Sequence, residues 1–247
     1  MSPRRVRFDW RQLRITRGAL VVFGLQLGLS VVWLMSTPSV RTTIADWLVA
    51  SPSHIFEEGK VWTLVTSPLL ETNFISLIFT GFMMWMLIPT LERFWGLGRF
   101  YRFVAITSVL GVLGGCLVGL ATGHDVAIHG LSPFIYASVV AFGVVYARQP
   151  VQFFGVLPLS GRQFMFGIVG FVLLWVVFQQ FWEQGGSFAA AMIAAAVMTS
   201  KRWSPGLVWK RWRIARARAH LSVIEGGASK ARSTRERKKA DEQRWLN

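Results

Sequence analysis

The middle of the chain holds the sequence Ile128-His129-Gly130-Leu131-Ser132-Pro133-Phe134-Ile135-Tyr136, a short polar break that opens a long apolar run. Further apolar runs lie on both sides of it. Serine is a preferred N-cap residue, and proline is well tolerated at the first position of a helix. The step from Ser132 to Pro133 therefore predicts a helix start, with Ser132 as the cap and Pro133 as the first helical residue.

The composition excludes an ordinary soluble domain. Of the 247 residues, 53% are hydrophobic and only 16% are charged, with a mean hydropathy of +0.43. These values are typical of a polytopic membrane protein. Cys116 is the single cysteine, so an intrachain disulfide and a zinc site built on thiolates are excluded, and we expect it to fill space in the core. No nucleotide, haem or metal motif is present, and we expect no cofactor.

Six apolar segments predict a bundle of six transmembrane helices, all α, because about 20 apolar residues span the hydrocarbon core as a helix. Their approximate bounds are 18–35, 74–91, 103–122, 132–147, 164–182 and 187–200. The first segment follows a basic start, as a cleaved signal peptide would. Its length and the lack of a clear small-x-small cleavage site favour a retained helix.

Small residues mark two of the predicted helices as interior ones, because they let membrane helices approach closely. The third segment carries Gly111, Gly115 and Gly119 at four-residue spacing, although glycine is also simply tolerated in membrane helices. The sixth is rich in alanine, with Ala189, Ala190, Ala191, Ala194, Ala195 and Ala196.

The basic residues are divided unevenly between the two sides that six spans define. Of the 27 Lys and Arg residues, 25 fall in the two terminal segments and in the connections that share their side. Only Arg41 and Lys60 fall in the other connections. By the positive-inside rule, both termini are expected to be cytoplasmic. We expect a multi-pass protein of the bacterial inner membrane.

Three regions follow from this organisation: a basic cytoplasmic segment over residues 1–17, the membrane domain over 18–200, and a basic cytoplasmic tail over 201–247. The first external connection, about 41–73, keeps apolar residues and is expected to lie on the membrane surface. The start of the tail mixes basic and aromatic residues, which suits an anionic leaflet or an acidic protein surface, and beyond Gly226-Gly227 it is expected to be disordered. Its candidate contact residues are Trp209, Lys210, Arg211, Trp212 and Arg213. Nucleic-acid binding is the weaker alternative, because the segment is tethered beside a membrane helix.

The motif Gly130-Leu131-Ser132 resembles the G-x-S motif in which rhomboid intramembrane serine proteases keep their nucleophile. The family pattern continues with a second glycine, and Pro133 stands in its place. Leu91-Glu92 and Gly96 match the family's L-E-x-x-x-G at the end of helix two. The resemblance covers roughly residues 18–200 and implies a six-helix rhomboid-like fold.

The entry to helix two also resembles the family, through a membrane-associated stretch that contains Trp62. Thr63 stands where the family usually has arginine. Counting back from the L-E-x-x-x-G anchor reaches the positions where active rhomboids carry two histidines and an asparagine that hold the oxyanion. This chain has Glu71, Ser76 and Thr80 there.

The general base of the family is a histidine in helix six, and the matching position here is Phe188, or Ser187 in a register shifted by one. A serine hydroxyl needs a positioned base, and the oxyanion needs preorganised donors. Both are missing, so the resemblance implies a catalytically inactive pseudoprotease of bacterial type. A divergent protease that uses Ser132 is the alternative.

Ionisable groups near the motif and along the second helix leave alternatives open. His129 or His124 could act as a substitute base for Ser132, with Asp125 as the only visible orienting partner; a solvated interfacial histidine is the simpler interpretation. Glu71 is expected to be solvated or paired with Lys60, although an acid near membrane depth is also a functional candidate. Glu92 is expected to be structural, with Arg93 and Arg99 as neighbours.

The sequence therefore favours a non-catalytic rhomboid-like protein that binds transmembrane segments of partner proteins, as an adaptor or as a subunit of a membrane complex. The family fold implies a lateral opening between helices two and five. Those helices are rich in aromatic and methionine residues, among which Trp85, Trp175 and Phe178 are the candidate contacts. A channel or carrier is disfavoured, because the spans hold almost no ionisable residues.

Overall fold

The computed structural model describes residues 16–147, 150–153, 157–200, 213–214 and 216. The chain divides into the units Met1–Ser200 and Lys201–Asn247, and the fold described below is that of the first unit. In the second unit, the described residues Arg213, Ile214 and Arg216 are helical and exposed. The expected helix and disorder of the rest of the tail, and the basic segment before residue 16, lie outside the described residues.

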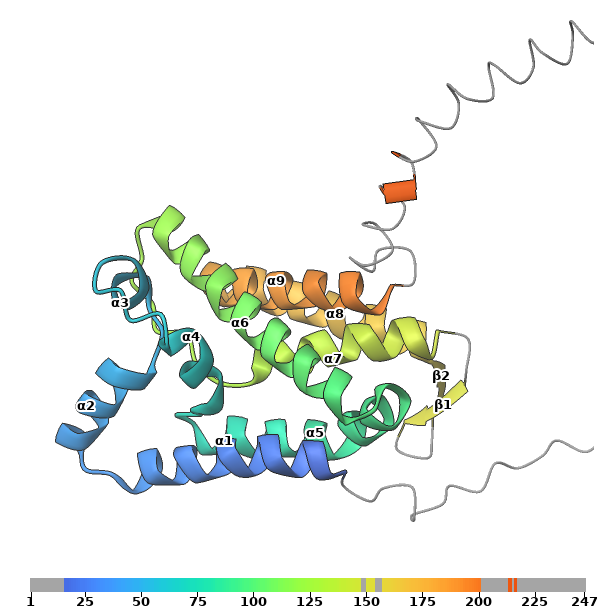
Figure 1. Cartoon of the computed structure of the whole chain (residues 1–247), viewed down its shortest axis with the longest axis horizontal. Coiled ribbons are helices and arrows are strands. Elements are labelled where there is room, and N and C mark those ends of the chain that lie inside the picture. Colours follow the sequence, from blue (N-terminus) through green and yellow to red (C-terminus); the bar gives the residue numbers. More distant parts are fainter. Residues whose placement is uncertain (1–15, 148–149, 154–156, 201–212, 215, 217–247) are drawn as a thin grey trace, which may run out of the picture. The chain divides into compact units, whose positions relative to one another are not determined.

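Long helices make up most of the first unit (Figure 1). Their bounds are α1 Arg17–Met35, α5 Phe74–Trp95, α6 Leu97–Thr122, α7 Ser132–Val145, α8 Gly161–Gln179 and α9 Trp182–Thr199. Each coincides with one of the apolar segments expected from the sequence, and the boundaries differ by at most six residues. The largest difference is at α6, which begins at Leu97 instead of residue 103 because the arginines at its start are tolerated in an exposed first turn.

Four of these helices, α1, α5, α6 and α8, are long and apolar enough to cross a membrane. Helix α7 is apolar but has only 14 residues, which corresponds to about 21 Å of helix. The described part of the chain is thus a largely helical, polytopic membrane protein. It is not purely α-helical: the strands β1 (Pro150–Phe153) and β2 (Leu157–Ser160) form an antiparallel hairpin between α7 and α8.

The connection between α1 and α5 is folded into short helices. They are α2 Pro38–Leu48, α3 Pro52–Phe56, α4 Thr63–Thr66 and the 3-10 turn η2 Ser67–Leu69. Exposed apolar side chains project from this region, including those of Trp47, Val61, Trp62 and Val65. Trp62 stacks on Trp47 with ring centroids 6.1 Å apart and donates its indole N–H to the Trp47 carbonyl oxygen at 2.9 Å.

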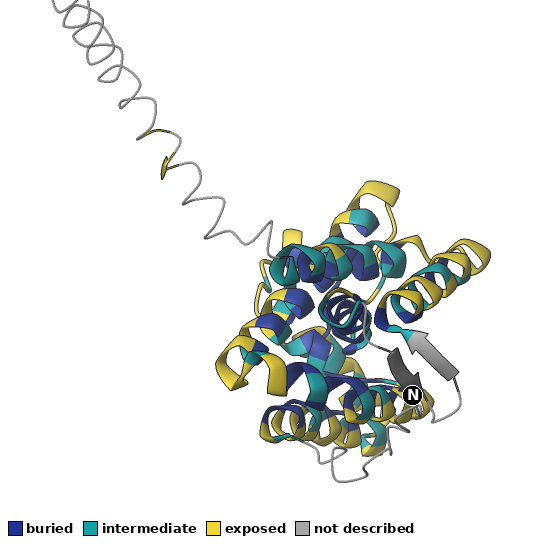
Figure 2. Cartoon of the chain, turned by 90° about the vertical axis from the view of Figure 1, so that its right-hand side faces the viewer, coloured by how far each residue is buried: buried dark blue, intermediate teal, exposed yellow. Residues whose placement is uncertain are grey.

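The interior of the unit forms where α6 and α7 pack against α9. A side chain on Gly115 would lie 2.9 Å from the carbonyl oxygen of Glu183, so this glycine allows α6 to touch the α9 backbone. Ala191 and Ala195 of α9 are fully buried, and Gly111 would clash with Pro133 of α7 if it carried a Cβ. The small residues of α6 and α9 therefore serve close helix packing, as expected. Figure 2 shows buried residues facing the inside of the helical bundle and exposed ones on its outside.

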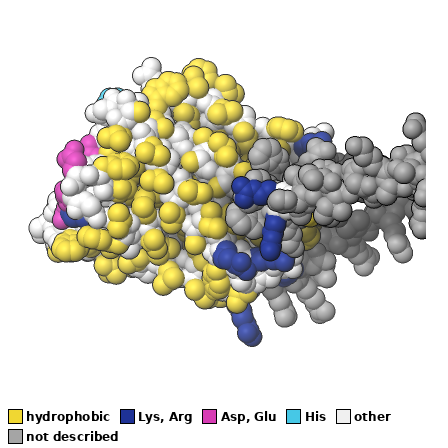
Figure 3. All heavy atoms as spheres, turned by 45° about the horizontal axis from the view of Figure 1, so that its top comes forward, with side chains coloured by type: hydrophobic (Ala, Val, Ile, Leu, Met, Phe, Trp, Pro, Cys, Tyr) yellow, Lys and Arg dark blue, Asp and Glu magenta, His cyan; other side chains and the backbone are white. Residues whose placement is uncertain are grey.

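The polar connections of the first unit gather at two ends. At one end, the 123–131 connection pairs with the α2–α3 region through a backbone bridge between Ala50 and Ile128. At the other end, the last turn of α5 meets the C-terminus of α7, where the rings of Phe94 and Tyr146 lie 6.2 Å apart. Figure 3 shows acidic side chains at one end and Lys and Arg at the other, with hydrophobic side chains between them. This is the pattern of a protein that crosses a membrane between two polar ends.

Candidate functional site

Ser132 lies at the start of α7, but it is not the cap that the sequence predicted. The helix begins at Ser132, the N-cap is Leu131, and no side-chain cap hydrogen bond forms. Pro133 is the second helical residue instead of the first. The prediction of a serine cap was wrong because Leu131 already has the φ of −82° and ψ of 5° that lead the chain into the helix. Among the described residues, no side chain forms a hydrogen bond with the Ser132 hydroxyl.

Phe188, which the rhomboid resemblance aligns with the family's general base, packs against α7. Its ring lies edge-on to Tyr136, with centroids 4.7 Å apart. Tyr136 is one turn after Ser132 on α7, so the face of α9 that carries Phe188 meets the face of α7 that carries Ser132. A phenyl ring can neither accept nor donate a proton. Ser187 is buried and its hydroxyl has no hydrogen-bond partner in the described structure, so neither register supplies a base.

The three positions that match the family's oxyanion residues do not converge on Ser132. Glu71 lies before α5, in the linker that follows η2, and only 4% of its surface is exposed. Ser76 is half-buried in the first turn of α5, and Thr80 is buried one turn further. Within the described chain, none of the three side chains donates a hydrogen bond to Ser132. A preformed oxyanion hole is therefore not assembled from these positions.

The two histidines of the 123–131 connection have other partners than Ser132. His124 Nδ1 lies 2.9 Å from Glu183 Oε1, which also accepts a hydrogen bond from Thr122 at 3.0 Å. His129 Nε2 lies 3.2 Å from the Thr72 hydroxyl, and Nδ1 is 3.9 Å from Glu71 Oε1.

Asp125 does not orient either histidine. It accepts hydrogen bonds from the backbone N–H and the hydroxyl of Ser53, at 3.0 and 2.6 Å. The substitute base considered from the sequence is thus not formed, and His129 is more buried than a solvated interfacial histidine would be.

Glu71 is neither solvated nor paired with Lys60, so both parts of that expectation were wrong. Lys60 Nζ instead pairs with Asp46 at 2.7 Å and with Glu58 at 2.6 Å. The α2–α4 region folds into its own polar cluster and leaves Glu71 on the inner side of the loop. Ser30 of α1 accepts a hydrogen bond from the Glu71 backbone N–H at 2.9 Å and holds the linker against that helix.

The Lys60 cluster contains the residues that come closest to a metal site in the described structure. Asp46, His54 and Glu58 place one potential ligand atom each within 4.8 Å of the others. The ammonium group of Lys60 already binds both carboxylates, and these hydrogen bonds lower the pKa of Asp46 and raise that of Lys60. The arrangement is explained by a lysine-centred ion-pair network.

Burial changes the titration of the Glu71 and His129 side chains. Burial raises the pKa of Glu71 to about 7, and the backbone N–H groups of Thr72 and Asn73 offset only part of this effect. Burial also lowers the pKa of His129. The two groups thus favour their neutral forms.

Glu92 is structural, as expected, but its hydrogen-bond donors among the described residues are not arginines. Its carboxylate accepts hydrogen bonds from the backbone N–H groups of Gly18 and Ala19, at 3.0 and 2.9 Å, and from the Thr16 hydroxyl. These are donors of the first turn of α1, where a negative charge is favoured by the helix dipole. Gly18 is required there, since a Cβ would lie 2.7 Å from Glu92 Oε2.

Two buried polar residues of α1 were missed in the sequence. Gln26 and Ser30 are both fully buried, and both amide atoms of Gln26 have no hydrogen-bond partner among the described residues. They lie four positions apart and so share one face of the helix. A polar pair at this spacing within an apolar run is the signal that could have identified them.

The candidate partner contacts lie on different helices. Trp85 of α5 is about one-third exposed, Trp175 of α8 is half-buried against Phe181, and Phe178 is 81% exposed. Arg213 is exposed in its own unit, and the other tail candidates lie outside the described residues.

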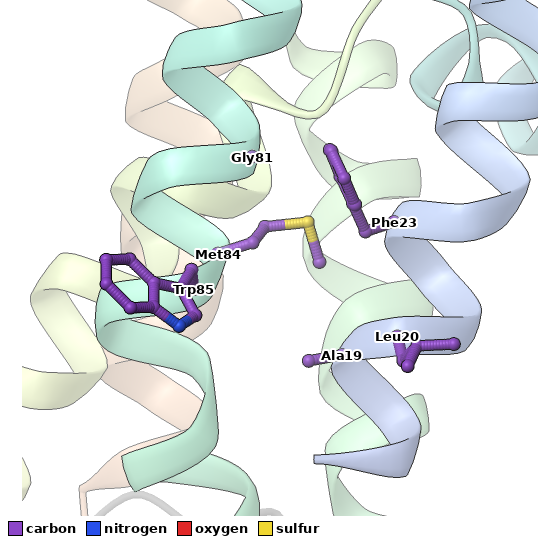
Figure 4. A pocket seen from close by; sticks show the side chains of 6 residues that line it. All are labelled: Ala19, Leu20, Phe23, Gly81, Met84 and Trp85. Atoms are coloured by element: carbon purple, nitrogen blue, oxygen red, sulfur yellow. The ribbon is translucent and has the colours of Figure 1, made fainter. Parts of the chain in front are cut away.

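Trp85 also borders a small apolar recess between α1 and α5. Figure 4 shows Met84 reaching from α5 toward α1, where Phe23 extends toward α5. A Cβ on Gly81 would lie 2.7 Å from the Phe23 ring, so the glycine admits that ring between the helices. The recess is lined by Ala19, Leu20, Phe23, Gly81, Met84 and Trp85. All of its lining residues are apolar, and we find no chemistry for it beyond contact with lipid.

Comparison with known proteins gives one family. The family model described as "Eukaryotic integral membrane protein (DUF1751)" matches residues 17–203, which is nearly the segment over which the rhomboid resemblance was seen. No curated protein matches the chain. The family description names eukaryotic proteins and therefore gives no support to a bacterial inner membrane. With its apolar helices and a match over well over half of its length, the chain is an integral membrane protein that belongs to this family, the eukaryotic integral membrane proteins of DUF1751.

Proposed function

We propose that this protein is a rhomboid-like membrane protein without protease activity, which binds transmembrane segments of partner proteins as an adaptor or as a subunit of a membrane complex. The rhomboid-like clan of the matching family supports the fold that this proposal assumes. We further propose six membrane spans and two cytoplasmic termini, from the distribution of basic residues in the sequence.

The observation that carries the proposal is the contact of Phe188 with Tyr136, which lies one turn after Ser132 on α7. The rhomboid resemblance aligns Phe188 with the family's general base, a phenyl ring cannot take a proton, and removal of the base costs on the order of 10⁶ in turnover. A protein that keeps the fold but has lost the general base can still bind partners through its surfaces, although it cannot hydrolyse peptide bonds.

The exposed face of α8 supports the binding part of the proposal. Among the four helices that could cross a membrane, α8 is the least buried. Val172 and Val176 hold it to the interior, where they pack with Phe188 of α9. Its opposite face is apolar, with the large exposed side chains Phe166, Phe171, Leu173, Leu174, Val177 and Phe178. Large side chains can pack against a partner helix in the membrane, where lipid otherwise covers them.

The basic tail supports a second attachment. Each Lys or Arg close to an anionic leaflet contributes about 1 kcal/mol, and an acidic protein surface attracts the tail in the same way. Deletion of residues 205–247 is expected to weaken retention of a partner while the helices remain inserted. The difference between the truncated and the full-length protein is expected to be largest at low salt, because high salt screens the attraction of the tail in the full-length protein as well.

A crosslinking experiment in native membranes tests the partner contact. A photoreactive amino acid at Phe178 of α8 is expected to give a discrete crosslinked protein. The same amino acid at Leu25 of α1, which is also exposed at 55%, is the matched control and is expected to give only lipid adducts. If neither position yields a discrete protein adduct and the full-length protein purifies alone in several mild detergents, the proposal is wrong.

A further inference from the structure

A buried carboxyl and a half-buried imidazole lie together at the end of the first unit that carries the 123–131 connection. Glu71 belongs to the linker between η2 and α5, and His129 belongs to that connection. Their closest side-chain atoms, Oε1 and Nδ1, are 3.9 Å apart. His129 Nε2 lies 3.2 Å from the Thr72 hydroxyl, so the other ring nitrogen of the imidazole also contacts the linker.

Polar atoms of this pair lack partners. Glu71 Oε2 and His129 Nδ1 are buried and have no hydrogen bond with any described residue. Oε2 faces the backbone of Gly130, in the space that a Cβ would fill. A buried carboxylate with one oxygen that lacks a partner is costly, whereas a protonated carboxyl removes the charge and can donate a hydrogen bond to a neighbour.

No other described charge balances the pair. The α1 face against this linker contributes the uncharged Gln26 and Ser30. Helix α1 carries no ionisable residue after Arg17, η2 carries none, and α5 carries none before Glu92. The other ionisable groups of the connection have their own partners: His124 contacts Glu183, and Asp125 binds Ser53. The nearby Lys60 is bound to Asp46 and Glu58. Only a proton on one of the two groups keeps this place electrically neutral overall.

We propose that Glu71 and His129 form a proton-binding site that shares one proton and thereby fixes the connection in front of α7 to the linker in front of α5. The proton lies on the carboxyl, between two neutral groups, because burial favours the neutral form of both side chains. Loss of the proton leaves a buried carboxylate, and a second proton leaves a partly buried imidazolium beside a neutral acid. Either change favours an open connection in which both groups reach water.

The same connection is held to the neighbouring loops by backbone hydrogen bonds. The Gly130 N–H donates to the Ser67 carbonyl oxygen at 3.1 Å, and the Ile128 N–H donates to that of Ala50 at 2.8 Å. Opening would break these bonds and free the residues that lead into α7. The proton site would therefore act as a pH-sensitive latch on this end of the bundle, whether or not the protein binds partner helices.

The pKa directions give the site its expected pH dependence. Glu71 has a raised pKa, so its contribution to closure is full below the ordinary value of 4.5 and is lost as the pH rises through about 7. His129 has a lowered pKa, so its contribution is present above its ordinary value of 6.5 and is lost as the pH falls below it. In the native protein, the pH dependence of closure due to Glu71 and that due to His129 have opposite signs. Replacing one of the two residues should therefore leave only the pH dependence of the other.

Hydrogen exchange of the full-length protein in lipid nanodiscs tests the latch. Protection of residues 124–131, corrected for intrinsic exchange, is compared at about pH 5 and about pH 8. Glu71→Gln keeps only the pH dependence of His129, so protection should be higher at about pH 8 than at about pH 5. His129→Gln keeps only the pH dependence of the Glu71 carboxyl, so protection should be at least tenfold lower at about pH 8 than at about pH 5. Each unit of pKa shift corresponds to a tenfold change in the equilibrium constant for opening. Glu57→Gln, which changes an exposed acid of the neighbouring loop outside the Lys60 ion-pair network, is the control and should match the unchanged protein.

The infrared absorption of the protonated carboxyl gives a readout that needs no folded variant. In the unchanged protein with isotope-labelled glutamate, one buried carboxyl should remain protonated well above pH 4.5. The proposal is overturned if every glutamate titrates near its ordinary value, or if both substitutions leave the pH dependence of exchange unchanged.

Discussion

The Glu71 carboxyl occupies the space beside Gly130 that any larger residue would need. Gly130 has a φ of +85°, and a Cβ built on it would overlap Glu71 Oε2. The glycine of the G-x-S motif is therefore required for two local reasons, its left-handed backbone and the buried acid, and neither involves catalysis by Ser132.

Replacement of this glycine should separate the two reasons. Gly130→Ala and Gly123→Ala both place a Cβ on a left-handed backbone, at φ of +85° and +75°, which costs about 1–2 kcal/mol. Gly123 has no atom near its Cβ position, so Gly130→Ala should cost about 1 kcal/mol more through the clash with Glu71. Thermal or denaturant unfolding in detergent measures the difference. Equal losses would mean that the carboxyl moves away freely.

Ser132→Ala should leave both chemistry and stability nearly unchanged. The hydroxyl has no base beside it and caps no helix, so the loss of about 0.5–2 kcal/mol typical of a removed cap is not expected. An active-site serine probe should fail to label the purified protein. Labelling that disappears in Ser132→Ala would instead establish the divergent protease.

Glu92→Ala should destabilise the protein. The substitution leaves the buried N–H groups of Gly18 and Ala19 without an acceptor, and each such group costs about 1–3 kcal/mol. Glu92→Gln keeps a side-chain oxygen and should lose less, while the exposed Glu57→Ala serves as the control. The unfolding midpoint is the measurement. If Glu92→Ala unfolds like the control, the carboxylate is not needed to hold α1.

The helices could be predicted because apolar runs must satisfy their backbone groups internally in a membrane. This rule placed α1, α5, α6, α7, α8 and α9 within a few residues. The hairpin of β1 and β2 was missed, because a short strand pair between two helices leaves little periodicity in the sequence.

The partners of the acidic residues could not be predicted, because they are set by folding between distant segments. The sequence suggested Lys60 as a partner for Glu71, but in the folded chain Lys60 pairs with Asp46 of α2. Glu92 was assigned to its neighbouring arginines, whereas its hydrogen bonds reach 73 and 74 positions back to α1. Local spacing gives no information on contacts of this range.

The contact between Asp125 and Ser53 should weaken at low pH. Partial burial raises the pKa of Asp125, but hydrogen bonds from Ser53 and Ser51 outweigh it and hold the pKa below its ordinary value. Its contribution to stability is therefore present above about pH 4 and is lost as the pH falls through the lowered pKa. Asp125→Asn should remove that acid-sensitive step, measured as the change in unfolding midpoint between about pH 5 and pH 3. The same step should persist in Glu57→Gln, and its persistence in Asp125→Asn would contradict the assignment.

The two ends of the bundle should face opposite sides of the membrane. Arg17, Arg93, Arg99, Arg102 and Arg162 lie at the helix ends and connections on one side of the proposed topology, whereas Arg41 and Lys60 lie on the other. The positive-inside rule places the first group in the cytoplasm, together with both termini. A reporter that is active only outside the cytoplasm should be silent when fused after Asn247 and active when inserted between residues 126 and 127, in the connection before α7. Activity at both places would require an odd number of spans, and then α7 or α9 would not cross the membrane.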